Sequence, residues 1–144
     1  MTDNFEVFPC PELDSSGLYH VHFFLHGLRH RPESAIDRVN TLNPRDLVLL
    51  MRDCQNKYDP QALALRTQED HLIGYLPRYI TNDVHKLLDE NPQAVSVQVE
   101  RVNSAPAPIQ LRLLCSVTAP WPEDFQPFSD RQYQPLPEFS EMNA

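Results

Sequence analysis

The sequence predicts a mainly β protein of the α+β class: a small six-stranded barrel with one or two short helices. Six short segments either alternate between apolar and polar residues or form brief apolar runs, which is typical of strands. Only residues 77–90 carry a clear helical stripe, and a second short helix is expected at 32–40. Because closure leaves few unpaired strand edges, we expect a closed or nearly closed barrel.

The predicted strands follow one another through the middle of the chain. They cover residues 19–26, 46–51, 62–66, 71–76, 94–102 and 109–117. The first alternates apolar residues with histidines, and the last two alternate just as cleanly. The third and fourth are expected to form a hairpin around the polar turn 67–70.

The main helix has start and stop signals as well as an apolar stripe. Pro77 fits its first turn, and Asn91 followed by Pro92 ends it. The stripe occupies positions i, i+4, i+7 and i+8: Ile80, Val84, Leu87 and Leu88. In the shorter helix at 32–40, Ile36 and Val39 are expected to point inward.

Charge and proline content divide the 144 residues into three parts. We expect an irregular arm at 1–16, a barrel domain at 17–118 and a Pro- and aromatic-rich acidic tail at 119–144. The net charge is −8, but basic and acidic residues balance at 11 each between 17 and 118. A neutral barrel lacks the broad basic field of a strong duplex binder, yet it permits a local site for a few phosphates.

Several classes of protein are disfavoured. No apolar run is long enough for a membrane span, and the acidic N-terminus lacks the order of a secretory signal, so we expect a cytoplasmic protein with no membrane partner. Three widely spaced cysteines, Cys10, Cys54 and Cys115, suggest reduced thiols. No Gly-rich phosphate loop, nucleophile elbow or carboxylate cluster is present, so we predict no enzyme activity and no cofactor.

Four histidines share one parity on the first strand and just beyond it: His20, His22, His26 and His30. That pattern raises the hypothesis of a metal site. However, two residues on one strand rarely complete a tetrahedron unaided, and no cysteine or carboxylate lies near them in the sequence. We therefore favour a polar strand face and predict no metal site.

The segment from residue 52 to residue 77 carries the strongest functional signal. Its polar turn presents an aromatic and a carboxylate, Tyr58 and Asp59, before the chain enters a strand. Aromatic, carboxylate and basic groups on a rigid β frame can stack on a base, bond a sugar hydroxyl and hold a phosphate. This combination favours a binding module over an enzyme.

Each of these residues also has a purely structural interpretation. Asp59 precedes a proline, and such a pair favours a turn in which the carboxylate bonds nearby backbone. Arg29 and Arg78 could be solvated surface charges, and Tyr75 could belong to the core. Only a tertiary structure can show whether the two arginines converge near Tyr58.

Three islands of the sequence together resemble the HIRAN domain. They are the strand that ends in Gly-Leu-Arg at 24–29, the segments 49–53 and 56–65, and Ile-Gly-Tyr-Leu-Pro-Arg at 73–78 followed by the Leu87-Leu88 helix. Their order and spacing match over roughly residues 18–118. The resemblance implies an OB- or SH3-like β-barrel that captures the 3′-hydroxyl end of single-stranded DNA.

The resemblance also implies roles for particular residues. Arg29 would contact the end phosphates, Tyr58 would stack on the terminal nucleoside, and Asp59 would accept a hydrogen bond from the 3′-hydroxyl.

Four further positions complete the implied site. Tyr75 and Arg78 take the places of phosphate-contacting residues, Asn56 would bond base or sugar edges, and His30 stands where the family has a second stacking aromatic.

These observations lead to one main prediction and one alternative. The main prediction is a module that binds single-stranded DNA, preferentially at a free 3′-hydroxyl end, in DNA repair, replication or recombination, with a separate helicase or nuclease as partner. The alternative is a protein-interaction adapter that uses the barrel and the Pro- and aromatic-rich tail.

Overall fold

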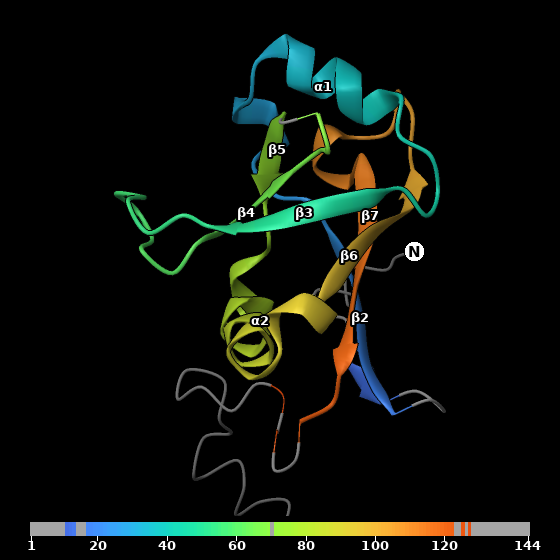
Figure 1. Ribbon diagram of the computed structural model, residues 1–144. Coiled ribbons are helices and arrows are strands. Elements are labelled where there is room, and N and C mark those ends of the chain that lie inside the picture. Colours follow the sequence, from blue (N-terminus) through green and yellow to red (C-terminus); the bar gives the residue numbers. More distant parts are fainter. Residues whose placement is uncertain (1–10, 14–16, 70, 123–124, 126, 128–144) are drawn as a thin grey trace, which may run out of the picture.

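The computed structural model describes residues 11–13, 17–69, 71–122, 125 and 127 (Figure 1). Within these residues the chain forms a seven-stranded antiparallel sheet in the order β1-β2-β7-β6-β3-β4-β5. The strands are β1 (Glu12–Leu13), β2 (Leu18–Phe24), β3 (Leu47–Arg52), β4 (Leu63–Arg66), β5 (Leu72–Tyr75), β6 (Ser96–Val102) and β7 (Leu113–Pro120). The helices are α1 (Glu33–Asn40) and α2 (Arg78–Glu90), with short 3-10 turns η1 (Leu28–His30), η2 (Pro92–Ala94) and η3 (Ile109–Leu111).

The predicted class and both predicted helices are confirmed, and each of the six predicted strands is present. The seventh strand, β1, lies in the segment predicted to be irregular, where it pairs with β2. The last predicted strand was expected to begin at Ile109, and this was wrong. Residues 109–111 form η3 because the N–H groups of Leu111 and Arg112 bond back to Pro108 and Ile109, at 3.0 and 3.1 Å.

The sheet curls until its last strand returns to the chain just beyond β2. His26 and Tyr75 form an isolated antiparallel bridge with two backbone hydrogen bonds of 3.0 and 2.8 Å. The predicted barrel is therefore nearly but not fully closed, because one residue pair takes the place of a whole ladder. Gly74 permits this approach, since a Cβ there would clash with the carbonyl oxygen of His26 and lie 2.8 Å from Leu25 Cδ1.

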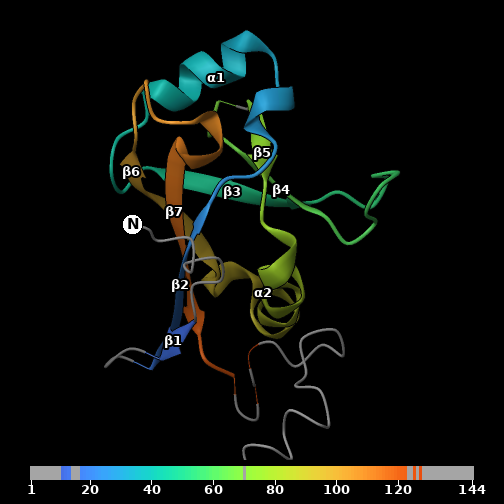
Figure 2. The ribbon, with the colours of Figure 1, turned by 180° about the vertical axis from the view of Figure 1, so that it is seen from behind.

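The core fills the inside of the curled sheet, and α1 and α2 lie at its opposite ends in both views (Figures 1 and 2). Inward positions of the central strands alternate with outward ones, as the sequence pattern predicts. Helix α2 buries Ile80, Val84 and Leu87, which are at most 2% exposed. Burial of each such side chain contributes about 1.5–3 kcal/mol to stability, so α2 is firmly fixed against the barrel.

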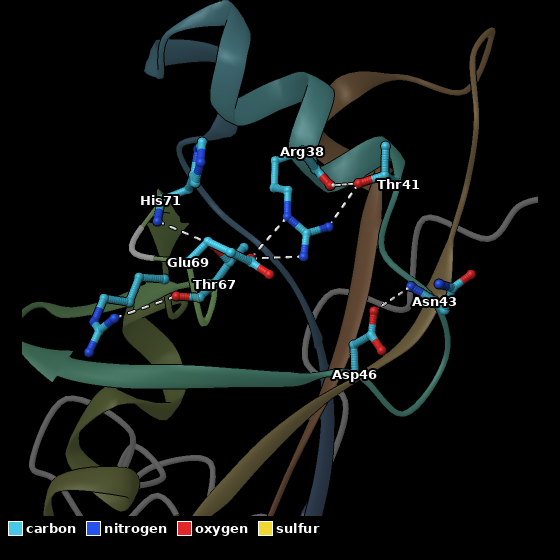
Figure 3. A network of polar contacts seen from close by, with 8 residues as sticks. Arg38, Thr41, Asn43, Asp46, Thr67, Glu69 and His71 are labelled. Atoms are coloured by element: carbon cyan, nitrogen blue, oxygen red, sulfur yellow. Dashed lines mark hydrogen bonds and ion pairs between the residues drawn. The ribbon is translucent and has the colours of Figure 1, made fainter.

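Helix α1 is held against the turn of the β4–β5 hairpin by a polar network (Figure 3). Arg38 donates two hydrogen bonds to Glu69 Oε1, at 3.1 and 2.9 Å, and a third to Thr41 Oγ1. Hydrogen bonding from the Arg38 guanidinium is the main cause that lowers the pKa of the Glu69 carboxyl. Within the hairpin turn, Thr67 Oγ1 accepts the N–H of His71 at 3.2 Å.

Strand β7 runs two residues into the segment predicted as a tail, and the chain then packs back onto the barrel. The rings of Trp121 and Phe125 lie 5.8 and 5.7 Å from that of Tyr19, between ring centroids. The tail from 128 onward, and with it most of the adapter alternative, lies outside the described residues. No helix in the described part of the chain is long and apolar enough to cross a membrane.

Candidate nucleic-acid interface

The candidate site is built on the loop between β3 and β4, residues 53–62, which projects beyond the sheet (Figures 1 and 2). Backbone hydrogen bonds close this loop upon itself. Asp53 N bonds Ala62 O and Ala62 N bonds Asp59 O, both at 3.0 Å, while Asn56 N bonds Asp53 O at 3.1 Å. A surface loop with this many internal bonds presents its side chains in one defined geometry.

Asn56 organises the tip of the loop. Its amide oxygen accepts the N–H groups of Tyr58 and Asp59, at 2.8 and 3.0 Å, and its amide nitrogen donates to Asp53 Oδ2 at 3.3 Å. Asparagine is well suited to this role because its short amide can replace backbone partners in a turn. Both the oxygen and the nitrogen of the Asn56 amide are thus hydrogen-bonded within the loop. A contact between Asn56 and a base or sugar remains a prediction.

The tip of the loop meets the first residue of α2, where Asp59 pairs with Arg78. The Tyr58 side chain stands out from the loop and is 90% exposed. Asp59 Oδ1 accepts the N–H of Gln61 at 3.0 Å, and Asp59 Oδ2 lies 3.6 Å from Arg78 Nε. The Arg78 side chain is 82% exposed but that of Asp59 only 22%, so the carboxylate is held in place while the guanidinium reaches into solvent.

Tyr75 connects this loop to the barrel. Its hydroxyl donates a hydrogen bond of 3.0 Å to Asp53 Oδ2, and its ring is partly buried. Burial, followed by the hydrogen bond to Asp53, raises the pKa of Tyr75 above that of a free tyrosine. The Tyr75 hydroxyl therefore stays protonated, and its hydrogen bond to Asp53 attaches the loop to strand β5.

Helix α2 holds the loop from the other side. Arg78, His85 and Asp89 are seven and four residues apart, so they share one face of the helix. His85 Nε2 lies 2.8 Å from Gln61 O, and Asp89 Oδ1 accepts a hydrogen bond of 3.0 Å from Arg52. The spacing of these three polar residues in the sequence indicates that they share one face of the helix. The sequence does not indicate that this face contacts the 53–62 loop.

Arg29 and His30 lie in a separate place, on η1. Gly27 has a φ of 83°, which lets the chain turn sharply out of the β2 direction into this 3-10 turn. Arg29 Nε donates to His30 Nε2 at 3.2 Å, and both residues line a cavity of about 340 Å³ together with Ile109 and Gln110.

The structure thus brings five of the seven predicted site residues onto or around the 53–62 loop. Among the described residues, no hydrogen bond or ion pair joins Arg29 or His30 to Tyr58 or Asp59. The connection between the two groups is the His26–Tyr75 bridge, which sets η1 beside the end of β5. Asp53 and His85, which the sequence did not single out, turn out to position the loop.

One family model and two solved structures are similar to this chain. The family model of the HIRAN domain matches residues 18–122. The crystal structure of the HIRAN domain of human HLTF aligns with a TM-score of 0.51 and 18% identity, over 74% of this chain and 81% of that chain. A crystal structure of a protein from Lactobacillus plantarum aligns with a TM-score of 0.49 and 22% identity, over 72% of this chain and 99% of that chain. A search of the curated proteins found no match.

Proposed function

Because the chain belongs to the HIRAN domain family, we propose that it is a nucleic-acid-binding module that captures single-stranded DNA, preferentially at a free 3′-hydroxyl end. DNA is the ligand that the family resemblance implies. The single observation that carries the proposal is an internally bonded loop in which the exposed Tyr58 directly precedes Asp59, the carboxylate that pairs with Arg78 of α2.

Stacking supplies affinity that is largely independent of sequence. The Tyr58 ring is 90% exposed, so it has apolar area to offer without first breaking contacts of its own fold. A base stacked on an aromatic side chain contributes about 1–3 kcal/mol. The loop is already closed by its own hydrogen bonds, so little further ordering is needed when a base binds.

Asp59 supplies the preference for a hydroxyl end. An ionised carboxylate is only an acceptor, so it can bind a 3′-hydroxyl and repels a 3′-phosphate. Its Oδ1 already accepts the N–H of Gln61, which fixes the plane of the group. The remaining acceptor positions are available to a sugar hydroxyl next to a base stacked on Tyr58.

Arginines supply the contacts to phosphates. Arg78 lies beside Asp59 with most of its side chain in solvent, and Arg29 lies on the neighbouring turn η1. A terminal nucleotide on Tyr58 would place its 5′ phosphate near Arg78, and the preceding phosphates could run toward Arg29 and His30. A guanidinium can bind phosphate through two parallel N–H groups.

This function needs no chemistry by the protein itself. We propose a non-enzymatic role in DNA repair, replication or recombination in the cytoplasm, in which the module holds a strand end for a separate helicase or nuclease.

Fluorescence anisotropy with short single-stranded oligonucleotides that end in 3′-hydroxyl or 3′-phosphate tests the proposal. The wild type should prefer the 3′-hydroxyl end. Tyr58→Ala should weaken binding to both ends by roughly 5- to 150-fold, which corresponds to about 1–3 kcal/mol of stacking. Asp59→Asn should reduce the preference between the two ends, because it removes the negative charge that repels the phosphate.

Arg101→Gln is the matched control, since it removes a charge on β6 outside the proposed site, where Arg101 bonds Asn103. Equal binding of wild type and Tyr58→Ala to both ends would exclude the proposed site. Circular dichroism of each variant distinguishes a lost contact from a lost fold.

A further inference from the structure

A second polar cluster lies on the outer face of strands β2, β7 and β6, away from the loop and the helix that build the nucleic-acid site. His20, His22 and Glu100 each offer a ligand atom there, and these atoms all lie within 4.8 Å of one another. We propose that these three side chains bind a divalent transition-metal ion, with Zn²⁺ as the first candidate. This inference is independent of the proposed DNA binding.

The two histidines are placed by a strand that is fixed on both sides. Strand β2 pairs with β1 and β7, with His20 opposite Thr118 and His22 opposite Ser116. Since side chains two residues apart on a strand point to the same face, both imidazoles stand side by side. Their ring centroids are 4.8 Å apart, with the ring planes nearly perpendicular.

Glu100 supplies the third ligand, which the sequence argument could not find. It lies on β6, two strands away from β2, at the point where the pairing with β7 shifts register between Val99 and Arg101. Bulges of this kind often re-aim a side chain. Glu100 Oε1 lies 3.7 Å from His22 Nε2, so the carboxylate already faces the imidazole pair.

Ser116 holds that carboxylate in position. Its hydroxyl is fully buried on β7, between the two strands that carry the ligands, and donates a hydrogen bond of 2.9 Å to Glu100 Oε2. Residues that ligate metals are commonly oriented by such hydrogen bonds. The bond leaves Oε1 pointing toward the histidines, which is the arrangement that an ion between the three groups requires.

The chemistry of the cluster matches a particular class of ion. Two imidazoles and one carboxylate are a ligand set for Zn²⁺ and similar transition metals, in which open positions are filled by water or a further ligand. The side chains of His22 and Glu100 are 43% and 36% exposed, so solvent can fill those positions. Ligand atoms around tetrahedral Zn²⁺ are about 3.3–3.5 Å apart, so small side-chain rotations would complete the site.

The thiol on the strand between β2 and β6 does not belong to the site. Cys115 lies on the core face of β7 and is 0% exposed, and burial raises its pKa to about 12. Among the residues that the structure describes, the ion would therefore have three ligands rather than four, and it would be exchangeable rather than a permanent structural element.

Isothermal titration of the full chain with ZnCl₂, after treatment with a chelator and desalting, tests the proposal. One Zn²⁺ per chain should bind with micromolar or tighter affinity. His22→Gln and Glu100→Gln should each weaken binding at least 10-fold, and Ser116→Ala about 10-fold with unchanged stoichiometry, as for residues that orient ligands. His71→Gln, which removes a histidine outside the cluster, is the matched control.

A second readout separates ligation from a merely structural effect. In ¹H–¹⁵N spectra tuned to the imidazole rings, Zn²⁺ should shift the signals of His20 and His22 and leave those of His71 and His85 in place. Binding that is weaker than micromolar, or equal in His71→Gln and His22→Gln, would overturn the assignment.

Discussion

Tyr75 donates its hydroxyl to Asp53 Oδ2 at 3.0 Å, and this bond ties the last strand of the barrel to the loop that presents Tyr58 and Asp59. The two residues are 22 positions apart. Asp53 Oδ2 also accepts a hydrogen bond from the amide nitrogen of Asn56. The amide oxygen of Asn56 in turn accepts the N–H groups of Tyr58 and Asp59. The Tyr75 hydroxyl therefore joins the barrel to the hydrogen-bonded chain that shapes the loop tip.

The first prediction concerns this bond. Tyr75→Phe keeps the ring but removes the donor, so we expect a loss of about 1 kcal/mol in the free energy of unfolding. Because the loop becomes less ordered, affinity for single-stranded DNA should fall several-fold. Anisotropy titration and urea unfolding measure the two effects, and faster amide hydrogen exchange in 53–62 should accompany them.

Tyr19→Phe is the control for the same chemical change. Tyr19 also donates to a carboxylate, Asp83 Oδ2 at 3.4 Å, but in the core and not in the loop. This variant should lose stability without losing affinity for DNA. Equal losses of affinity in the two variants would show that general stability, and not the Tyr75–Asp53 bond, controls binding.

The second prediction concerns the closure of the barrel at Gly74. In Gly74→Ala the new methyl would clash with the His26 carbonyl and with the Leu25 side chain, so the His26–Tyr75 bridge must open. We expect a loss of about 2–3 kcal/mol in the free energy of unfolding, as for an overpacked core. Gly17→Ala should cost only about 1 kcal/mol, because that site has a φ of 80° but open space around it. Similar values for the two would argue that the close approach at Gly74 is unimportant.

The third prediction concerns salt. If Arg29 and Arg78 are the main phosphate contacts, log K should fall with log salt with a slope of about −1.4, since each phosphate contact on a single strand adds about −0.7. Arg78→Gln should reduce the slope to about −0.7, and Arg101→Gln should leave it unchanged. Anisotropy titrations at several salt concentrations give the slopes, and a wild-type slope steeper than about −4 would indicate an extended basic surface instead.

The fourth prediction concerns alkaline pH. Burial raises the pKa of Cys115 from its ordinary value of 9.0 to about 12. The folded chain therefore keeps the thiol protonated where the unfolded chain has lost the proton. The stability that this contributes is fully present below pH 9 and is lost as the pH rises toward 12, with a slope that approaches about 1.4 kcal/mol per pH unit.

Cys115→Ala should reduce this slope, and the raised pKa values of Tyr19, Tyr75 and Tyr79 account for what remains. The variant also lowers stability at neutral pH by leaving a small cavity. Urea unfolding from about pH 7.5 to pH 9 measures it, mostly below the pH at which ordinary tyrosines, with a pKa of about 10, lose their proton. Cys54→Ala, which removes an exposed thiol, should retain the slope of the wild type. A wild-type slope that persists in Cys115→Ala would place its origin elsewhere.

Local sequence patterns were sufficient for the elements of this fold. The alternation around Tyr19, Val21 and Phe23 predicted β2, and the stripe from Ile80 to Leu88 predicted α2 almost to its ends. The same alternation wrongly predicted that the last strand begins at Ile109, because the apolar spacing also runs through the 3-10 turn that follows Pro108. Periodicity indicates which side of an element is apolar. It does not indicate where backbone hydrogen bonds change from a neighbouring strand to a local turn.

The candidate site was only partly visible in the sequence. Tyr58 and Asp59 stood out because they are adjacent, and the resemblance to the HIRAN domain added Arg78 and Tyr75. The roles of Asp53 and His85 had no local signal, since their partners Tyr75 and Gln61 are distant in the chain. Arg29 and His30 lie on the turn η1, and their contacts to phosphate and base stay predictions.

The sequence by itself determined the β-rich class, the two helices, the family and the residues with chemistry to offer. Only the tertiary structure decided which of these residues meet: Tyr75 with Asp53, Arg78 with Asp59, and Glu100 with His22. The physical reason is that short-range periodicity sets the face on which a side chain lies, whereas its neighbour across a sheet depends on strand order and register. Those are decided by packing between segments that are far apart along the chain.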